Sequence, residues 1–170
     1  MGIPQNPVSV AQAVQWAQAQ SLDRLDAQLL VLHALGRGAH DRAWLLVHDT
    51  DALPDTAHAT LQAAVLRRVA GEPLAYITGH KEFFGLDLQV DARVLVPRPD
   101  TETLVEWALQ TISGLQAPSV LDLGTGSGAI ALAIAHTRRD AKVTAVDFST
   151  DALAVAQANA QRLQLPVAFA

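Results

Sequence analysis

The stretch SVLDLGTGSGAIALAIA, residues 119–135, constrains the fold of this chain more than any other segment. A short apolar run ends at Asp122, glycines follow at 124, 126 and 128, and an apolar pattern with helical spacing begins directly after them. Glycine adopts backbone conformations with positive φ that other residues avoid, so alternate glycines predict a tight, sharply bent loop. The segment therefore indicates a strand, a glycine turn and a helix in direct succession.

The residues that follow continue this alternation of strand and helix. Residues 143–146 form a second strand-like run, and residues 151–163 form a second helical pattern that Ser149 or Thr150 can begin. PVAFA, residues 166–170, starts a third strand. This order calls for a parallel sheet with right-handed crossovers, in which ligands bind at the carboxyl ends of the strands. We therefore predict an α/β fold with the glycine turn at its ligand-binding edge.

The first part of the chain has a different pattern. Between residues 8 and 71, apolar residues recur at helical spacing, which predicts a small helical bundle. From residue 74 the pattern changes to that of a linker with a β-hairpin, in which Gly85 allows a tight turn. The short β-like runs lie at residues 82–84, 87–90 and 93–96.

Composition limits what the chain can be. Its 170 residues allow one ordinary domain or two small ones. It contains no cysteine, and its six histidines lack ligand spacing, so we predict neither disulfides nor a metal site. The net charge of −5 comes without a basic cluster, which argues against direct binding of nucleic acid. Residues 1–10, MGIPQNPVSV, lack the regions of a signal peptide, and we expect a cytoplasmic protein without membrane contact.

Two acidic residues narrow the choice of ligand for the glycine turn. Gly124, Gly126 and Ala129 match the dinucleotide fingerprint, and Asp147 stands near the spacing of a ribose-binding acid. This match alone does not separate a nicotinamide cofactor from S-adenosylmethionine, because both contain an adenosine ribose. Asp122 would repel a pyrophosphate beside the glycines, whereas it suits the ammonium and sulfonium groups of S-adenosylmethionine. The third glycine, at 128, would let the backbone approach the ligand closely.

The segment PRPDTE, residues 97–102, is the second unusual stretch. Its two prolines fix their own φ and push the arginine between them towards an extended conformation. Asp100 or Thr101 can cap the following helix, with Glu102 in its first turn. The segment has two interpretations: a rigid, capped entry to a helix, or a stiff loop over a ligand pocket.

Three segments of the chain carry motifs that occur together in one known family. They are RRVAGEPLAYITGHKEFFGLDLQVDARVLVPRPDTETLVEWAL (67–109), VLDLGTGSGAIALAIA (120–135) and VTAVDFSTDALAVAQANAQRL (143–163). With these motifs the chain resembles the HemK-type release factor glutamine methyltransferases. The resemblance covers nearly the whole chain, and GEPLAYITG and PRPDTE distinguish it from sibling enzymes that methylate a ribosomal protein.

The resemblance implies both a fold and an activity. The fold is a small N-terminal helical domain joined by a hairpin to a Rossmann-like methyltransferase domain. The activity is methyl transfer from S-adenosylmethionine to the side-chain amide nitrogen of the GGQ glutamine of peptide-chain release factors. On this chain it implies a substrate-docking domain at 1–72, a hairpin linker at 73–100 and the N-terminal part of the methyltransferase domain at 101–170.

The resemblance also assigns site residues. The glycine turn and the acid beside it would line the methionine part of the cofactor, the acid after the second strand would bind its ribose, and the PRPDTE segment would form the rim of the pocket. The cofactor-binding residues are Asp122, Gly124, Thr125, Gly126, Ser127, Gly128 and Asp147, and the rim residues are Arg98, Asp100, Thr101 and Glu102.

The family's catalytic signature, Asn-Pro-Pro-Tyr after the fourth strand, does not occur in these 170 residues. In the family, the asparagine side chain and a proline carbonyl hold the glutamine amide in line with the methyl group. The resemblance therefore implies an N-terminal portion of such an enzyme, with no catalytic residue in this chain and no activity of the chain alone. Two other classes stay open: a nicotinamide-dependent reductase and a non-catalytic protein-interaction fragment.

Overall fold

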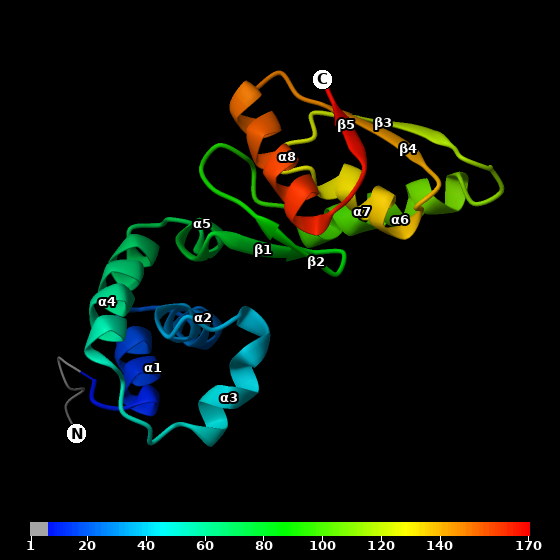
Figure 1. The fold of residues 1–170 in the computed structure, drawn as a ribbon. Coiled ribbons are helices and arrows are strands. Elements are labelled where there is room, and N and C mark those ends of the chain that lie inside the picture. Colours follow the sequence, from blue (N-terminus) through cyan, green and yellow to red (C-terminus); the bar gives the residue numbers. More distant parts are fainter. Residues whose placement is uncertain (1–6) are drawn as a thin grey trace. The chain divides into compact units, whose positions relative to one another are not determined.

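The structure, a computed structural model, describes residues 7–170. It divides into two units, one that ends at Thr78 and one that runs from Gly79 to Ala170 (Figure 1). The prediction about a signal peptide concerns residues 1–10, of which residues 1–6 lie outside the described residues. Within residues 7–170, no helix is long and apolar enough to cross a membrane.

The first unit is a bundle of short helices, as the apolar spacing predicts. Two of them begin at side chains that cap free backbone N–H groups: the Ser9 hydroxyl accepts from Gln12 N–H (3.4 Å), and the Asp23 carboxylate accepts from Asp26 N–H (2.8 Å). The helices are α1 (Val10–Ala19), α2 (Arg24–Ala34), α3 (Arg42–Val47), α4 (Asp55–Val69) and α5 (Leu74–Thr78), with a 3-10 turn at Ala39–Asp41.

This bundle has a hydrophobic core of its own. Leu30 and Val31 of α2 and Leu61 and Val65 of α4 are almost completely buried, and Ile77 of α5 belongs to the same cluster. Because α5 contributes to the core, the helical unit runs to Thr78, past the predicted boundary at residue 72.

The second unit begins with a two-stranded hairpin. β1 (His80–Phe83) and β2 (Leu86–Gln89) pair antiparallel, with Phe83 opposite Leu86. The two turn residues, Phe84 and Gly85, both have positive φ (51° and 75°), which matches the twist of the strands they join. The predicted turn at Gly85 is therefore confirmed, and the hairpin belongs to the second unit instead of standing between two domains.

The third β-like run, residues 93–96, does not form a strand, so this prediction is wrong. The Asp91 carboxylate accepts from the backbone N–H of Arg93 (2.9 Å), and Val94 N–H donates to the Asp91 carbonyl (3.1 Å). Local side-chain bonds of this kind compete with strand pairing. The chain turns here and continues towards the PRPDTE segment.

A three-stranded parallel sheet forms the centre of the second unit, and it confirms the predicted alternation. The strand order is β3-β4-β5, with Val120 opposite Val143 and Val143 opposite Val167. The elements are α6 (Glu102–Thr111) after a 3-10 turn at Pro99–Thr101, β3 (Ser119–Leu123), α7 (Ala129–Thr137), β4 (Lys142–Val146), α8 (Thr150–Leu163) and β5 (Val167–Phe169).

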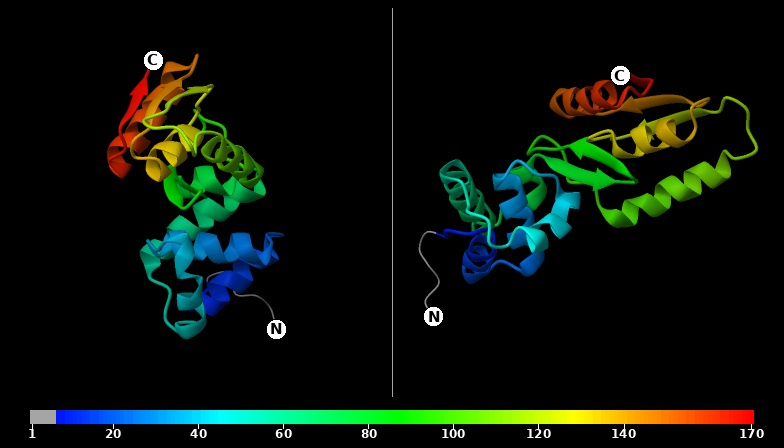
Figure 2. Two further views of the ribbon diagram at one scale, coloured as in Figure 1. Left: turned by 90° about the vertical axis from the view of Figure 1, so that its right-hand side faces the viewer. Right: turned by 60° about the horizontal axis from the view of Figure 1, so that its bottom comes forward.

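The helices of this unit cover one face of its sheet. The left view of Figure 2 shows α6, α7 and α8 on the same side of the three strands. On the other face, Leu121 and Leu123 of β3 are 58% and 73% exposed. Strands with apolar residues on both faces are typical of parallel sheets that are covered on both sides. The glycine turn leaves the sheet at the carboxyl end of β3, where the parallel topology predicts a ligand.

Candidate functional site

The glycine turn has the bent backbone that its sequence predicts. Gly124, Gly126 and Gly128 have φ values of 73°, 56° and 84°, all in the region that favours glycine. The N–H groups of Gly124 and Thr125 both donate to the carbonyl of Val146 at the end of β4 (2.9 and 3.0 Å). The turn is thus anchored to the neighbouring strand before it enters α7.

The three glycines serve different purposes. A Cβ on Gly124 or Gly126 would meet no other atom within 4 Å, so these residues border open space. A Cβ on Gly128 would lie 3.0 Å from Leu132 Cδ1 and 3.2 Å from Ala156 Cβ. The sequence suggests that Gly128 admits a ligand, but the structure gives it a packing reason: without a side chain, α7 can approach α8.

Asp147 lies directly after β4, and its carboxylate is hydrogen-bonded to the glycine turn. Its Oδ2 atom accepts from Gly126 N–H (2.8 Å), and its Oδ1 atom accepts from Ser149 N–H (2.9 Å). These backbone donors, Ser149 first and Gly126 second, hold the pKa of Asp147 below its usual range because they favour the charged form. The carboxylate therefore stays ionised at neutral pH, and each of its oxygens keeps a further acceptor position.

Asp122 places a second carboxylate beside the turn. It is 8% exposed, and its Oδ2 atom accepts from the hydroxyl group of Thr125 (2.7 Å). Because a carboxylate has room for about four hydrogen bonds, this one contact leaves acceptor positions open. The turn thus lies between two carboxylates, an arrangement that favours a ligand with positive charge and hydroxyl groups over an anionic one.

The PRPDTE segment forms the entry to α6. Thr101 occupies the N-cap position of α6, but its side chain makes no capping bond. Glu102 accepts from Phe84 N–H in the hairpin turn (3.1 Å), whereas Arg98 and Asp100 are exposed. Hydrogen bonds join the turn residues Thr125 and Gly126 to Asp122 and Asp147, and among the described residues none joins Arg98, Asp100, Thr101 or Glu102 to the turn.

The sequence motifs do not include one further residue that contacts the glycine turn. Asn159 of α8 is completely buried, and its side-chain amide donates to the carbonyl of Ser127 in the turn (3.0 Å). The signal in the sequence is an amide on an otherwise apolar helical stripe. That stripe consists of Ala152, Val155, Ala156, Asn159 and Ala160.

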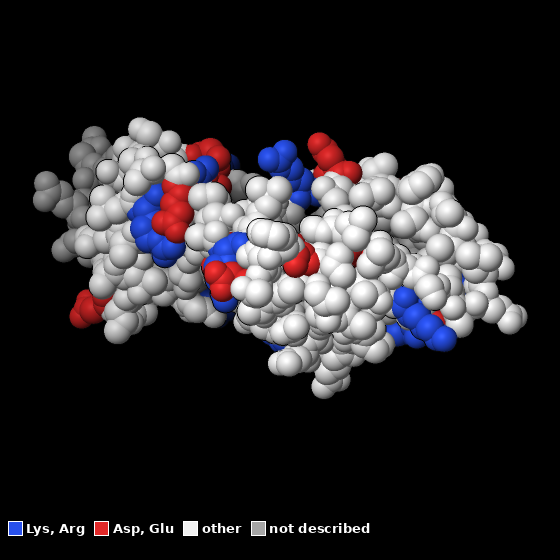
Figure 3. Space-filling view, turned by 90° about the horizontal axis from the view of Figure 1, so that it is seen from above, with Lys and Arg blue, Asp and Glu red and all other residues white. Residues whose placement is uncertain are grey.

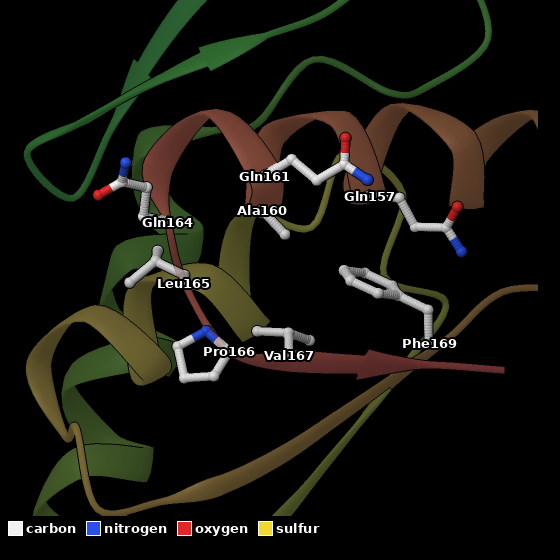
Figure 4. Close-up of a pocket in the computed structure, with 8 residues that line it drawn as sticks. All are labelled: Gln157, Ala160, Gln161, Gln164, Leu165, Pro166, Val167 and Phe169. Atoms are coloured by element: carbon white, nitrogen blue, oxygen red, sulfur yellow. The ribbon is translucent and has the colours of Figure 1, made fainter.

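A hollow of about 660 Å³ lies elsewhere, between α8 and β5 (Figure 4). Its lining carries no ionisable group and lacks the residues of the glycine turn, so we assign it no chemistry. The lining includes Gln157, Gln161, Gln164, Leu165, Val167 and Phe169.

Charged residues show no concentration on the face drawn in Figure 3. On that face, basic and acidic residues lie close to one another, and the described residues form no continuous basic area. Among the described residues, no group of three or more metal-ligating side chains occurs either.

The comparison with known proteins agrees with this architecture. A family profile described as "Methyltransferase domain" matches residues 116–170, and one described as "PrmC N-terminal domain" matches residues 10–79. The partial Rossmann-like sheet and its glycine turn thus belong to the methyltransferase class of α/β folds.

Curated relatives define the family within this class. The release factor glutamine methyltransferase of Bordetella pertussis is 54% identical over 142 residues, which cover 84% of this chain and 52% of that protein. The protein of that name from Escherichia coli is 45% identical over 154 residues, 91% of this chain and 54% of the protein. The chain is therefore related to the release factor glutamine methyltransferases, which confirms the resemblance seen in the sequence, and it spans about half the length of the curated relatives it matches.

Solved structures align with smaller parts of the chain. A tRNA (uracil-54, C5)-methyltransferase of Pyrococcus abyssi, in complex with S-adenosyl-L-homocysteine, is 17% identical, with a TM-score of 0.44. The alignment covers 54% of this chain and 22% of that chain.

Proposed function

We propose that the complete gene product transfers a methyl group from S-adenosylmethionine to the side-chain amide nitrogen of the GGQ glutamine of peptide-chain release factors. The observation that carries this proposal is the glycine turn between Asp122 and Asp147, in a chain related to enzymes named for glutamine methylation of release factors. Since release factors act in translation, the proposal also places the protein in the cytoplasm.

The residues around the turn fit S-adenosylmethionine better than a dinucleotide. The partly satisfied carboxylate of Asp122 would accept from the methionine ammonium group, and the free acceptor positions of Asp147 would receive the two ribose hydroxyl groups. The open space beside Gly124 and Gly126 leaves room for the methionine part. Two like charges about 4 Å apart repel by roughly 4 kcal/mol near a protein surface, so a pyrophosphate here would be disfavoured.

The cofactor, when bound, supplies an electrophilic methyl group, and this chain positions it. Thr125 and Ser127 complete the backbone of the turn that would line the methionine part. We further propose that Arg98, Asp100, Thr101 and Glu102 form the rim of the pocket. The contact of Glu102 with the hairpin turn supports this proposal, because it fixes the start of α6.

Calorimetric titration of the complete gene product with S-adenosylmethionine and, separately, with NAD⁺ tests the choice of cofactor. We expect binding of S-adenosylmethionine only, together with transfer of a labelled methyl group to release factor. Binding of NAD⁺ in its place would favour the nicotinamide-dependent reductase, to which the spacing of Gly124, Gly126 and Ala129 also points. A protein that binds neither cofactor but retains release factor would be an interaction module.

Replacing Asp147 by alanine in the complete gene product should weaken binding of S-adenosylmethionine at least about tenfold, since bonds to a charged acceptor contribute roughly 1.5–3 kcal/mol each. The substitution also frees the N–H of Gly126, so the turn loses one of its anchors. Asp151→Ala is the matched control, because it removes the same charge from the exposed first turn of α8. Equal affinities of the Asp147 variant and the wild type would remove the ribose role from Asp147.

We propose that the helical unit docks the release factor. Its own core, which includes Leu30 and Leu61, supports independent folding. Deleting residues 1–78 from the complete gene product should therefore raise the KM for release factor and leave the Kd for S-adenosylmethionine nearly unchanged. Steady-state kinetics and calorimetry measure the two quantities. Loss of cofactor binding with an unchanged KM would contradict the docking role.

A further inference from the structure

A buried amide in the middle of α8 requires an explanation that the proposed function does not supply. Asn159 is completely buried, whereas Gln157 and Gln161 of the same helix are exposed. An unpaired amide in an apolar environment is unfavourable, so a buried asparagine is retained only where its polar atoms have partners.

Asn159 has a partner for each of its hydrogen-bonding functions. Its Oδ1 atom accepts from Gln89 N–H (2.7 Å), and its Nδ2 atom donates to the Gln89 carbonyl (2.9 Å). The amide thus pairs with one residue in both directions, as a neighbouring strand would at the end of β2. The second N–H of Nδ2 donates to the Ser127 carbonyl (3.0 Å), so both donors and the acceptor are in use.

Asn159 donates to the Ser127 carbonyl, which accepts no hydrogen bond from the backbone of α7. Leu132 N–H donates to the Gly128 carbonyl, so the first turn of α7 closes one residue after Ser127. Ser127 is 2% exposed, and without Asn159 its carbonyl would lose the partner that the structure gives it.

Two adjacent residues of the glycine turn are therefore held by two different parts of the crossover that follows β4. Gly126 donates to Asp147 at the start of the crossover, and Ser127 accepts from Asn159 in the crossover helix. We propose that Asp147 contacts the ligand directly, whereas Asn159 is completely buried and both of its N–H donors are in use.

We propose that Asn159 is a positioning residue for the cofactor-binding turn: it sets the peptide plane after Ser127 and ties the turn to the hairpin through Gln89. This inference rests on the proposed function, because the turn must bind S-adenosylmethionine for its position to matter. The inference also gives the hairpin a role. Because the Asn159 side chain bonds both Gln89 and Ser127, a displacement of β2 at Gln89 would move the glycine turn.

The test compares variants of the complete gene product for affinity and stability. Asn159→Ala removes all three bonds. Asn159→Asp, studied at alkaline pH where the new carboxyl group is ionised, keeps the shape and the acceptor but removes both donors. Val155→Ala truncates a buried apolar side chain of the same helix and removes no hydrogen bond, and Gln161→Ala removes an exposed amide from that helix. Each variant is characterised by its Tm, its Kd for S-adenosylmethionine and its steady-state kinetics.

We expect both Asn159 variants to bind S-adenosylmethionine at least about tenfold more weakly, because each leaves buried carbonyl groups without a donor. Their KM for the cofactor should rise, with kcat at saturating cofactor and the KM for release factor nearly unchanged. Val155→Ala should lower the Tm and keep its affinity, and Gln161→Ala should change neither.

Two results would overturn the inference in different ways. If Asn159→Ala loses stability but matches Val155→Ala in affinity, or if Asn159→Asp binds like the wild type, Asn159 only fills space in the core. If the wild type itself does not bind S-adenosylmethionine, the proposed function fails and this inference fails with it. Should Asn159→Ala not fold, Asn159→Ser, whose single hydroxyl group can donate to only one of the two carbonyls, takes its place in the same comparison.

Discussion

A Gly126→Val variant of the complete gene product is expected to lose at least about a hundredfold in affinity for S-adenosylmethionine, equivalent to about 2.8 kcal/mol. Two effects add. Gly126 has a φ of 56°, where a β-branched residue is strained, and the left-handed conformation costs an ordinary residue roughly 1–2 kcal/mol. The new side chain would also project into the open space beside the turn, where we place the methionine part of the cofactor.

Gly36 provides a matched control for the strain alone. It also has a positive φ (67°), and a Cβ on it would meet no atom within 4 Å, but it lies in the helical unit. Gly36→Val should therefore lower the Tm, measured by calorimetry, while the Kd for S-adenosylmethionine stays that of the wild type. If Gly126→Val behaves in the same way, with lower stability and normal binding, the turn has only a structural purpose.

The parts of the fold that the sequence predicts well are those whose signals are local. β3, α7, β4 and α8 lie within a residue or two of their predicted positions, because strand-like runs and helical spacing alternate without interruption there. The run at 93–96 has the composition of a strand but fails because Asp91 offers its backbone a local partner. Composition alone does not reveal that competition, since it depends on the geometry of a single side chain.

The candidate site shows the same division between local and long-range information. The sequence predicts that Asp147 follows the second strand, but not that it accepts from Gly126 N–H. The sequence contains glycine at 128 but does not show why it is needed, because the neighbour that requires it, Ala156, is 28 residues further along the chain. Asn159 is missed for this reason too: its partners at 89 and 127 become neighbours only when the hairpin, the turn and α8 pack together.

The 170-residue chain by itself is expected to transfer no methyl group to release factor. In the family that it resembles, asparagine and proline residues hold the glutamine amide, and that signature does not occur in these residues. Positioning of the two reacting groups accounts for a large share of the rate in such reactions, so a chain without the residues that hold the glutamine amide should not support the transfer. An assay with labelled S-adenosylmethionine and release factor, with the release factor glutamine methyltransferase of Escherichia coli as positive control, measures this directly, and transfer above the blank would contradict the expectation.

The same chain is also expected to self-associate through β3. Among residues 7–170, β3 pairs only with β4, so its other edge offers unpaired N–H and C=O groups. Leu121 and Leu123, which are 58% and 73% exposed, add an apolar surface beside that edge, and such edges are sites of aggregation.

Sedimentation velocity at increasing concentration should show oligomers, and Leu121→Lys should reduce them, because a charge on an exposed strand opposes pairing. Leu46→Lys, on an exposed leucine of the helical unit, is the matched control and should leave them unchanged. A chain that stays monomeric at every concentration, with strong amide protection across β3, would contradict this picture, because the open edge of β3 leaves amides of that strand accessible to water.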